Sequence, residues 1–479
     1  MKFNFSKYSF SEATLKKPSV IFLIFVTCFS FFFVDLFKIW DAHKSQHNFR
    51  WDIFNYYCYL PYKFCNNNSF EFVNDSFDAN EFSGSGFIPR YPDGKLIPKA
   101  TYGMSVMYAP FFVLAYKIAY NQGSPLTGFS EPFATCVHWG SVFYVIFGLF
   151  FLRKFLLNFF NEWVTTITLS ITFFGTMLFV YTYNLSEMSH GYLFFLFSVF
   201  LYLIPKWHAQ QKFIYTVLIG ISIGLISLIR PTEIIVFVFF VFWNVRTLPE
   251  LKEKFRFFLK NYLHIIIIGV IGVLLWIPQF IFWKNQTGNY FFFSYPGERF
   301  FWNDPQIINI LFSYRKGWVT YTPVIITAFI GFFFIKKDFP LSKWVLISVT
   351  CLFVYVLSCW WDWFFGGCFG ARGFCQHIAF LSIPIAFFIQ FVFYTSKKYI
   401  FKPIISLLTI VFLASCICLN LAQSYQYVNR HIHPTGMSKE TYWYIFGKFY
   451  YDQEDDYKFW GTIKAPDYDK LKSGEDREQ

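Results

Sequence analysis

Charged residues are scarce in this sequence of 479 residues: Asp, Glu, Lys and Arg together make up 15% of the chain. Hydrophobic residues make up 55%, and 72 residues are phenylalanine. A water-soluble domain of this length would need more charged surface and far fewer phenylalanines. The composition therefore excludes a soluble protein and predicts a polytopic membrane protein.

Other absences narrow the class. The first apolar run, 19–40, lacks a small-residue cleavage site, which predicts a retained anchor and not a removed signal peptide. The predicted cytoplasmic connections contain no glycine-rich loop that would cradle phosphates, which argues against a nucleotide-driven pump and a nucleotide-sugar donor. No two halves of the chain match, whereas transporters usually contain internal repeats.

The apolar runs predict an all-α protein with about 11 transmembrane helices. The predicted spans are 19–40, 133–152, 163–183, 189–205, 213–229, 232–245, 262–283, 318–335, 343–360, 377–394 and 403–421. A further run, 101–120, contains Pro110 and Lys117 and is weaker. It is either another span or a helix that lies in the membrane interface.

The positions of Lys and Arg decide between these two alternatives. If 101–120 stays in the interface, the basic clusters all face one side, where the segments contain 19 Lys and Arg and 5 acids. Basic residues concentrate in cytoplasmic loops, so we expect the N-terminus inside and the C-terminus outside the plasma (inner) membrane. The net charge of +12 then reflects topology and does not indicate a nucleic-acid partner.

This topology divides the chain into a transmembrane module, 1–421, and an outer-face tail, 422–479. The first outer loop, 41–132, should contain interfacial helices. We expect the aromatic first half of the tail to dock onto the outer face and roughly the last fifteen residues to be disordered.

A single acid, Asp52, lies in this first loop shortly after the first predicted span, within Arg-Trp-Asp-Ile-Phe-Asn-Tyr-Tyr. Tyr56 and Tyr57 follow it. An isolated carboxylate at the membrane face is a candidate general base, although a solvated loop aspartate gives the same pattern. We predict a catalytic role for Asp52 and substrate contacts for the two tyrosines.

Two junctions between spans contain ionisable residues. Glu187 and His190 are three residues apart and would share a helical face. Such groups at bilayer depth tend to be functional or paired, and a helix cap with a satisfied histidine is the alternative. Arg230 stands in a tight junction where the positive-inside rule disfavours it, and a guanidinium fork matches phosphate oxygens. An intramembrane pair between Arg230 and Glu233 is its alternative.

Two later outer loops add cations. Arg315 lies in Leu-Phe-Ser-Tyr-Arg-Lys-Gly-Trp, 311–318, and Arg372 follows the glycines of a tryptophan-rich segment, 360–373. Glycines beside an arginine suggest close backbone approach to a ligand, so we predict that Arg372 or Arg315 forms a second phosphate contact.

Cysteine and histidine give weaker signals. Five cysteines are expected to face outward: Cys58, Cys65, Cys359, Cys368 and Cys375. Their odd number leaves at least one unpaired, and Cys58 with Cys65, or Cys368 with Cys375, could form a small disulfide. His43 and His47 have a spacing suited to a metal, but no third ligand is evident, so we predict no metal site there.

The early outer aspartate with its tyrosines, the polar junction at Glu187 and the Arg-Pro-Thr hairpin at 230–232 resemble the integral-membrane GT-C glycosyltransferases that use polyprenyl-phosphate sugars. These include the protein O-mannosyltransferases and the aminoarabinose transferases of lipid A. The resemblance covers roughly 19–421 and is architectural. The acid that stands next to the catalytic aspartate in several such families is absent, because Trp51 and Ile53 flank Asp52.

The resemblance implies a transferase that moves a sugar from a polyprenyl-phosphate donor to a lipid, glycan or protein acceptor. Asp52 would take the acceptor's proton, and Arg230 with Arg372 or Arg315 would stabilise the departing phosphate, so that a divalent metal is optional and no cofactor is required. Two alternatives stay open. One is an O-antigen ligase or polymerase that uses a polyprenyl-diphosphate glycan, and the other is a flippase for lipid-linked sugars.

Overall fold

The computed structural model describes residues 16–40, 49, 51–70, 95–395, 401–450 and 452–477, with the backbone alone for 35–40. Helices dominate these residues, and their β-structure is limited to isolated bridge positions, among them Val245–Leu341 and Phe300–Trp360. The prediction of an all-α protein is therefore confirmed for this part of the chain. His43 and His47 lie outside the described residues.

The elements, in chain order, are α2 (Pro18–Trp40), α3 (Trp51–Tyr57), α4 (Tyr59–Phe64), α6 (Gly103–Gln122), α7 (Glu131–Leu156), α8 (Glu162–Phe174), α9 (Leu178–Tyr183), α10 (Ser189–Ala209), α11 (Phe213–Ile229), η2 (Pro231–Phe237), α12 (Val238–Val241), α13 (Leu248–Lys260), α14 (Tyr262–Thr287), α15 (Ile307–Phe312), α16 (Trp318–Tyr321), η3 (Pro323–Ile325), α17 (Ile326–Gly331), η4 (Phe332–Phe334), α18 (Lys343–Cys359), η5 (Arg372–His377), α19 (Ile378–Gln390), η6 (Phe391–Thr395), α20 (Lys402–Val428), α21 (Lys439–Ile445), α22 (Gln453–Thr462) and α23 (Tyr468–Ser473).

Five described helical segments are long and apolar enough to cross a membrane: Glu131–Leu156, Ser189–Ala209, Tyr262–Thr287, Arg372–Thr395 and Lys402–Val428. Five shorter apolar segments accompany them: Pro18–Val34, Phe213–Ile229, Pro231–Val241, Pro323–Phe334 and Lys343–Cys359. A bilayer core about 30 Å thick needs about 20 apolar residues in a helix. Length and composition thus give the chain the character of a membrane protein.

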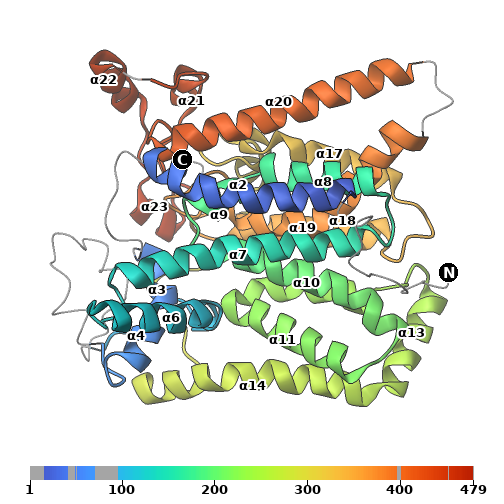
Figure 1. Cartoon of the computed structure of the whole chain (residues 1–479), viewed down its shortest axis with the longest axis horizontal. Coiled ribbons are helices and arrows are strands. Elements are labelled where there is room, and N and C mark those ends of the chain that lie inside the picture. Colours follow the sequence, from blue (N-terminus) through green and yellow to red (C-terminus); the bar gives the residue numbers. More distant parts are fainter. Residues whose placement is uncertain are drawn as a thin grey trace.

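The long helices lie side by side in one bundle with two distinct ends (Figure 1). The short helices α3 and α4, helix α6 and the tail helices α21–α23 gather at one end, which we call the loop end. Helix α13 crosses the opposite end, where α2 also begins.

Several of the predicted spans are interrupted in the structure; 318–335, for example, is divided into α16, η3, α17 and η4. The span 163–183 is split, because α8 ends at Phe174 and α9 starts at Leu178. Asn420 Nδ2 donates to the carbonyl oxygens of Phe174 and Thr176, both at 2.9 Å, which satisfies backbone groups that the break exposes. The span 232–245 begins as the 3₁₀ helix η2 and has a single short α-helix, α12.

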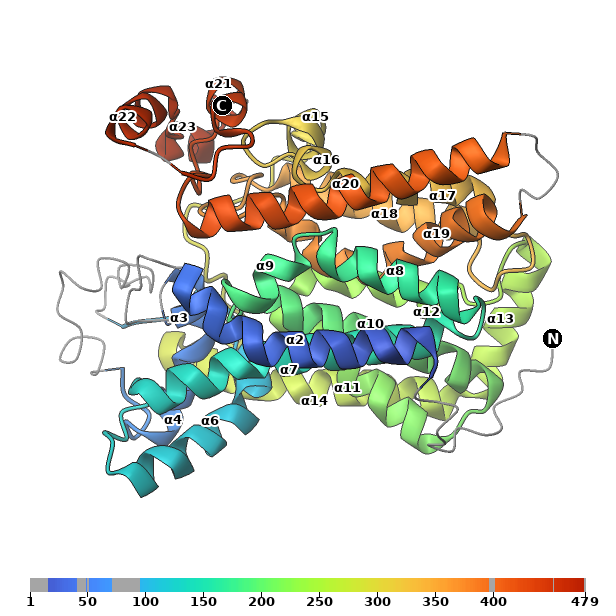
Figure 2. The ribbon, with the colours of Figure 1, turned by 45° about the horizontal axis from the view of Figure 1, so that its top comes forward.

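The ambiguous run 101–120 forms α6, which is not among the five membrane-length apolar segments. Its first residue, Gly103, lies against the end of α11: a Cβ atom there would come within 2.8 Å of the backbone of Leu228 and Ile229. From this contact α6 leaves the bundle obliquely at the loop end (Figure 2). Its exposed apolar side chains include Val113, Leu114 and Tyr120.

The tail packs against the loop end, and the expectation of a disordered end is wrong as far as residue 477. Arg477 is 3% exposed, and its guanidinium donates to the carbonyl oxygens of Ser358 and Trp360 at 3.1 and 2.8 Å. Trp363 Nε1 in turn donates to the Arg477 carbonyl at 2.8 Å. The acidic composition of the tail suggested disorder, but a buried arginine bonded to loop carbonyls anchors it.

All ten cysteines are in the described part of the chain, and each is a free thiol. The two disulfides that the spacing left open, Cys58–Cys65 and Cys368–Cys375, are therefore not formed.

Candidate functional site

Asp52 and Arg372 form an ion pair at the loop end. Arg372 Nη2 donates to Asp52 Oδ2 at 2.8 Å, and the side chains of Arg372 and Asp52 are 13% and 31% exposed. Arg372 Nε is buried and has no hydrogen-bond partner among the described residues, and neither does Asp52 Oδ1. The pair therefore leaves a guanidinium donor and a carboxylate oxygen available to a ligand.

A second carboxylate, Asp362, is buried near this pair. It is 9% exposed, and its Oδ1 has no hydrogen-bond partner among the described residues. Burial raises the pKa of Asp362 from 3.8 to about 7, and the charges of Glu298 and Asp52 add to this effect, whereas the Gly366 backbone and Arg372 oppose it. Asp362 therefore changes its charge near neutral pH.

The turn that carries Asp362 has an unusual backbone. Phe365 and Gly366 have φ values of 58° and 62°, in the left-handed region that a bulky residue such as phenylalanine avoids. Strain of this kind persists where the surrounding structure enforces it and often marks functional sites.

Glu298, Lys99 and Tyr295 complete the polar cluster. Glu298 is 8% exposed and accepts from Lys99 Nζ at 2.6 Å and from Trp361 Nε1 at 2.9 Å. Tyr295 lies on the same loop, and its pKa is raised by burial and by the nearby Tyr56 and Asp52. The segment between α2 and α6, the loop 288–306 and the loop 360–371 thus all contribute to one site.

Arg230 approaches this cluster from the end of α11. Its backbone is extended, with φ −144° and ψ 107°, and its side chain is partly exposed. The guanidinium forms no hydrogen bond or ion pair with any described residue, yet it lies within electrostatic range of Tyr295 and His190. Arg230 is therefore a cation without a protein counter-ion in the described part of the chain.

Glu233 does not pair with Arg230. The carboxylate of Glu233 is completely buried, with Oε2 2.8 Å from His377 Nε2 and with Oε1 accepting from Gln376 Nε2 at 2.6 Å. Gln376 Oε1 is 3.0 Å from His190 Nδ1. The intramembrane pair that the sequence left open is replaced by a network that ties η2 to η5 and α10.

Glu187 and His190 are both buried but have different partners. Glu187 precedes α10 and has its Oε1 3.1 Å from His138 Nδ1. His190 is on α10, bonds to Gln376, and has an Nε2 atom without a partner among the described residues. Only His190 is linked to the segment that carries Arg372, so the predicted shared role of the two residues receives no geometric support.

Of the two tyrosines after Asp52, only one lies near Arg372. The Tyr56 side chain is 7% exposed and lies within electrostatic range of Arg372 and Tyr295. Tyr57 is fully buried, stacks on Phe49 with ring centroids 3.9 Å apart, and donates its hydroxyl to the Gly128 carbonyl. Tyr56 therefore belongs to the site, whereas the contacts of Tyr57 hold the first loop together.

Arg315 holds the tail. Its Nη1 donates to the Thr435 carbonyl at 2.6 Å, and its guanidinium lies over the Phe364 ring at 5.0 Å. Burial lowers its pKa. The neighbouring Lys316 is 1% exposed and donates to the Cys368 carbonyl. Of the two arginines predicted as the second phosphate contact, Arg372 is the one that lies against Asp52.

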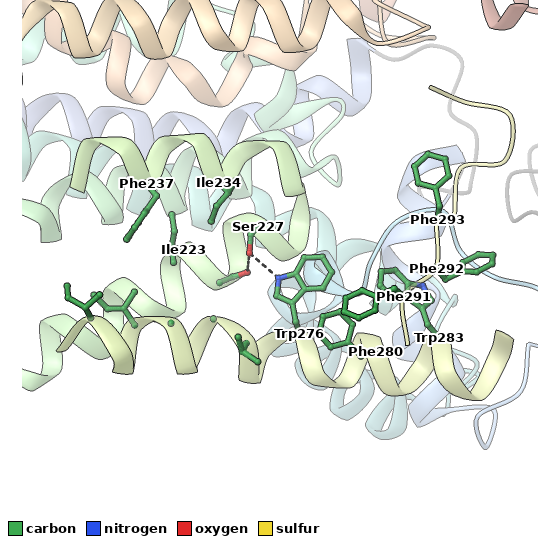
Figure 3. Close-up of a pocket in the computed structure, with 16 residues that line it drawn as sticks. Ile223, Ser227, Ile234, Phe237, Trp276, Phe280, Trp283, Phe291, Phe292 and Phe293 are labelled. Carbon is green, nitrogen blue, oxygen red and sulfur yellow. Dashed lines mark hydrogen bonds between the residues drawn. The ribbon is translucent and has the colours of Figure 1, made fainter. Parts of the chain in front are cut away.

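An apolar groove of about 840 Å³ lies between α11, η2 and α14. It is lined by side chains such as Ile223, Phe237 and Ile268, and Figure 3 shows an aromatic group at one end, where Trp276 Nε1 donates to Ser227 Oγ at 3.1 Å. Ser227 is three residues before Arg230 on the same segment, roughly 5 Å along a helix. The wall of the groove therefore comes within one helical turn of Arg230 along the chain.

Sequence reasoning missed Lys99, Tyr295, Glu298 and Asp362. The available signal was an acid in an outer loop beside tryptophan, since Asp362 follows Trp360 and Trp361 directly. Lys99 and Glu298 gave no such signal, because their pairing joins loops that are far apart in the sequence.

The described residues contain no group of three or more His, Cys, Asp or Glu side chains arranged to hold a metal ion. The polar cluster instead combines carboxylates with Arg372 and Lys99, which suits an uncharged or anionic organic ligand. No protein-family model and no curated protein matches the sequence.

Proposed function

We propose that this chain is an integral-membrane glycosyltransferase of the GT-C type, which moves a sugar from a polyprenyl-phosphate donor to an acceptor on the outer face of the membrane. The observation that carries the proposal is the Asp52–Arg372 pair, with its free carboxylate oxygen and its unpartnered guanidinium donor. Arg230, a second cation without a counter-ion among the described residues, lies close by.

The proposed chemistry uses these groups in one displacement. Asp52 Oδ1 accepts the proton of an acceptor hydroxyl or amine while the acceptor atom attacks the anomeric carbon. The bond between that carbon and the phosphate oxygen breaks, and polyprenyl phosphate leaves with the bonding electrons. Arg372 and Arg230 stabilise its charge, so the leaving group needs no proton donor.

The groove between α11 and α14 supports the choice of a lipid-linked donor. It is almost entirely apolar, and its lining residue Ser227 is three residues before Arg230. An isoprenoid chain in the groove would place its phosphate beside a cation. A nucleotide-sugar donor would have no use for such a groove.

The proposal includes 11 spans, with the loop end outside and α13 inside. In the described part, the exposed Lys336 and Lys337 lie in a short connection beside α13, because Arg246, just before this helix, donates to the Asp338 carbonyl at 2.6 Å. The positive-inside rule places the α13 end in the cytoplasm.

The decisive experiment measures sugar transfer or release by the purified protein from polyprenyl-phosphate and polyprenyl-diphosphate donors. We expect turnover with the monophosphate donor and its loss in Asp52→Asn. Turnover restricted to diphosphate donors would indicate a ligase or polymerase. Movement of lipid-linked sugar across a vesicle membrane without bond cleavage would indicate a flippase.

A further inference from the structure

Helix α13 lies across the end of the bundle opposite the candidate site. It starts with a capping box, in which Glu250 N donates to Thr247 Oγ1 at 3.4 Å and Thr247 N donates to Glu250 Oε2 at 3.0 Å. Its axis runs across the direction of α14, which follows it (Figure 1). Helix α13 therefore lies along the end surface of the bundle, across the direction of the long helices.

One face of α13 packs inward. Phe257 lies 5.7 Å from Trp207 between ring centroids, and Phe258 stacks on Phe240, also at 5.7 Å. Lys254 is buried on this side and lies 5.5 Å from both phenylalanine rings. These contacts fix the rotation of the helix about its axis.

With this rotation fixed, a second face is apolar and uncovered. Leu248, Phe255 and Leu259 are 76%, 65% and 59% exposed, and their spacing of seven and four residues places them on one stripe. The stripe leads to the first turns of α14, where Tyr262, Leu263 and Ile266 are also more than half exposed. α14 is one of the membrane-length helices and is largely exposed along its length. The stripe is therefore continuous with a surface that faces lipid.

Beside the apolar stripe lies a row of cations. Lys252, Arg256 and Lys260 are exposed, are spaced four residues apart, and form no ion pair with any described residue. Glu253 is the one acid on this side of the helix. Basic residues that border an apolar stripe characterise helices that lie in the interface of anionic membranes.

We propose that α13 is a binding site for anionic phospholipid, with Leu248, Phe255 and Leu259 among the acyl chains and Lys252, Arg256 and Lys260 on the headgroup phosphates. A lipid is favoured over a protein partner because the apolar stripe continues into the flank of α14, which no described segment covers. This inference does not depend on the proposed transferase activity.

The test uses the full-length protein in nanodiscs of phosphatidylcholine with and without phosphatidylglycerol. Lipid retained on the purified protein is measured by native mass spectrometry, and thermal stability is measured in both mixtures. The variant is Lys252→Gln with Arg256→Gln and Lys260→Gln. The control is Lys212→Gln with Lys336→Gln and Lys337→Gln, which removes the same charge from two connections near α13. Thr216, four residues after Lys212, has its Oγ1 2.6 Å from His264 Nδ1 at the start of α14, and Arg246, just before α13, donates to the Asp338 carbonyl.

We expect the wild type and the control to retain several-fold more phosphatidylglycerol than phosphatidylcholine and to melt a few degrees higher when it is present. The α13 variant should lose most of both differences. An equal loss in the control would show a general charge effect, and full retention by the variant would show that α13 binds no anionic lipid. A change of oligomeric state in Phe255→Ser would assign the stripe to a second copy. Each of these three results overturns the proposal.

Discussion

The carboxylate of Asp52 and the guanidinium of Arg372 are 2.8 Å apart, although 320 residues separate them in the sequence. Asp52 is on α3, and Arg372 begins η5 immediately before the apolar helix α19. Two short helices that are far apart in the sequence therefore build the centre of the candidate site, where an acid and a cation are adjacent.

The first prediction concerns Asp52. Asp52→Asn keeps the size of the side chain but removes the proton acceptor, so transfer should fall by roughly 10²–10⁴-fold. Folding should change little, because the carboxylate is partly exposed. The measurement is turnover by purified protein with a polyprenyl-phosphate donor, beside Asp456→Asn, an exposed tail acid, as the control. Activity of Asp52→Asn equal to that of the control would remove Asp52 from the mechanism.

The second prediction is a pH dependence from Asp362, whose pKa is about 7 in the folded protein and normally 3.8. The folded protein therefore holds a proton that the unfolded chain releases between about pH 4 and pH 7. Stability should fall as the pH rises through this window and then level off. Asp362→Asn should flatten the curve of melting temperature against pH. An unchanged slope of melting temperature against pH would mean that Asp362 does not titrate in this pH range.

The third prediction concerns Glu233. Glu233→Ala leaves His377 and Gln376 without their buried acceptor, which should cost on the order of 3–5 kcal/mol. Glu233→Gln retains one carbonyl acceptor and should cost less. Because the network holds η5, whose first residue is Arg372, the Gln variant should also raise the KM for the donor more than it lowers kcat. Thermal melting and kinetics of both variants test this, and equal, negligible shifts in melting temperature would contradict it.

The sequence predicted the elements better than the site. The apolar run 213–229 coincides with α11, because Lys212 and Arg230 bound it with polar residues. The broken span at Gly175 was missed, since Asn420, far along the chain, satisfies its carbonyls. Local pattern does not encode such a partner.

The same limit applies to side-chain pairing. Asp52, Arg230 and Arg372 were predicted because each is out of place in its local context: an acid among aromatics, or a cation on the side predicted to face outward. The partners of Glu233 could not be found, because the nearest charge in sequence is Arg230, whereas His377 reaches it only through the packing of η5 against η2. Proximity in sequence suggested Arg230 as the alternative partner, and that pair is not formed.

The fourth prediction concerns topology. A reporter that is active only in the cytoplasm, fused after Gln479, should be inactive, and one fused after Lys260 should be active. The first reporter follows Arg477, which is bonded to the loop carbonyls of Ser358 and Trp360, by two residues, and the second follows the last residue of α13. Activity at both positions would show that the number of membrane crossings between them is even, which contradicts 11 spans with the first residue inside.

The last prediction concerns Arg230 and its unusual position, a partly exposed cation at the end of an apolar helix without a counter-ion among the described residues. If a donor phosphate is its partner, Arg230→Lys keeps the charge but loses the bidentate hydrogen bonding of a guanidinium. This variant should therefore retain part of the activity. Arg230→Ala should lose on the order of 2–4 kcal/mol of transition-state stabilisation, roughly 30- to 1,000-fold in kcat/KM.

Stability separates this interpretation from a structural one. Glu233 is bound by His377 and Gln376 and not by Arg230, so neither Arg230 variant should lower the melting temperature, and Glu233→Gln should not rescue them. Donor affinity, measured with a non-transferable polyprenyl phosphate, should weaken in the order wild type, Lys, Ala. A large destabilisation with unchanged lipid binding would mean that Arg230 supports the fold, and the phosphate would then have to be assigned to Arg372 alone.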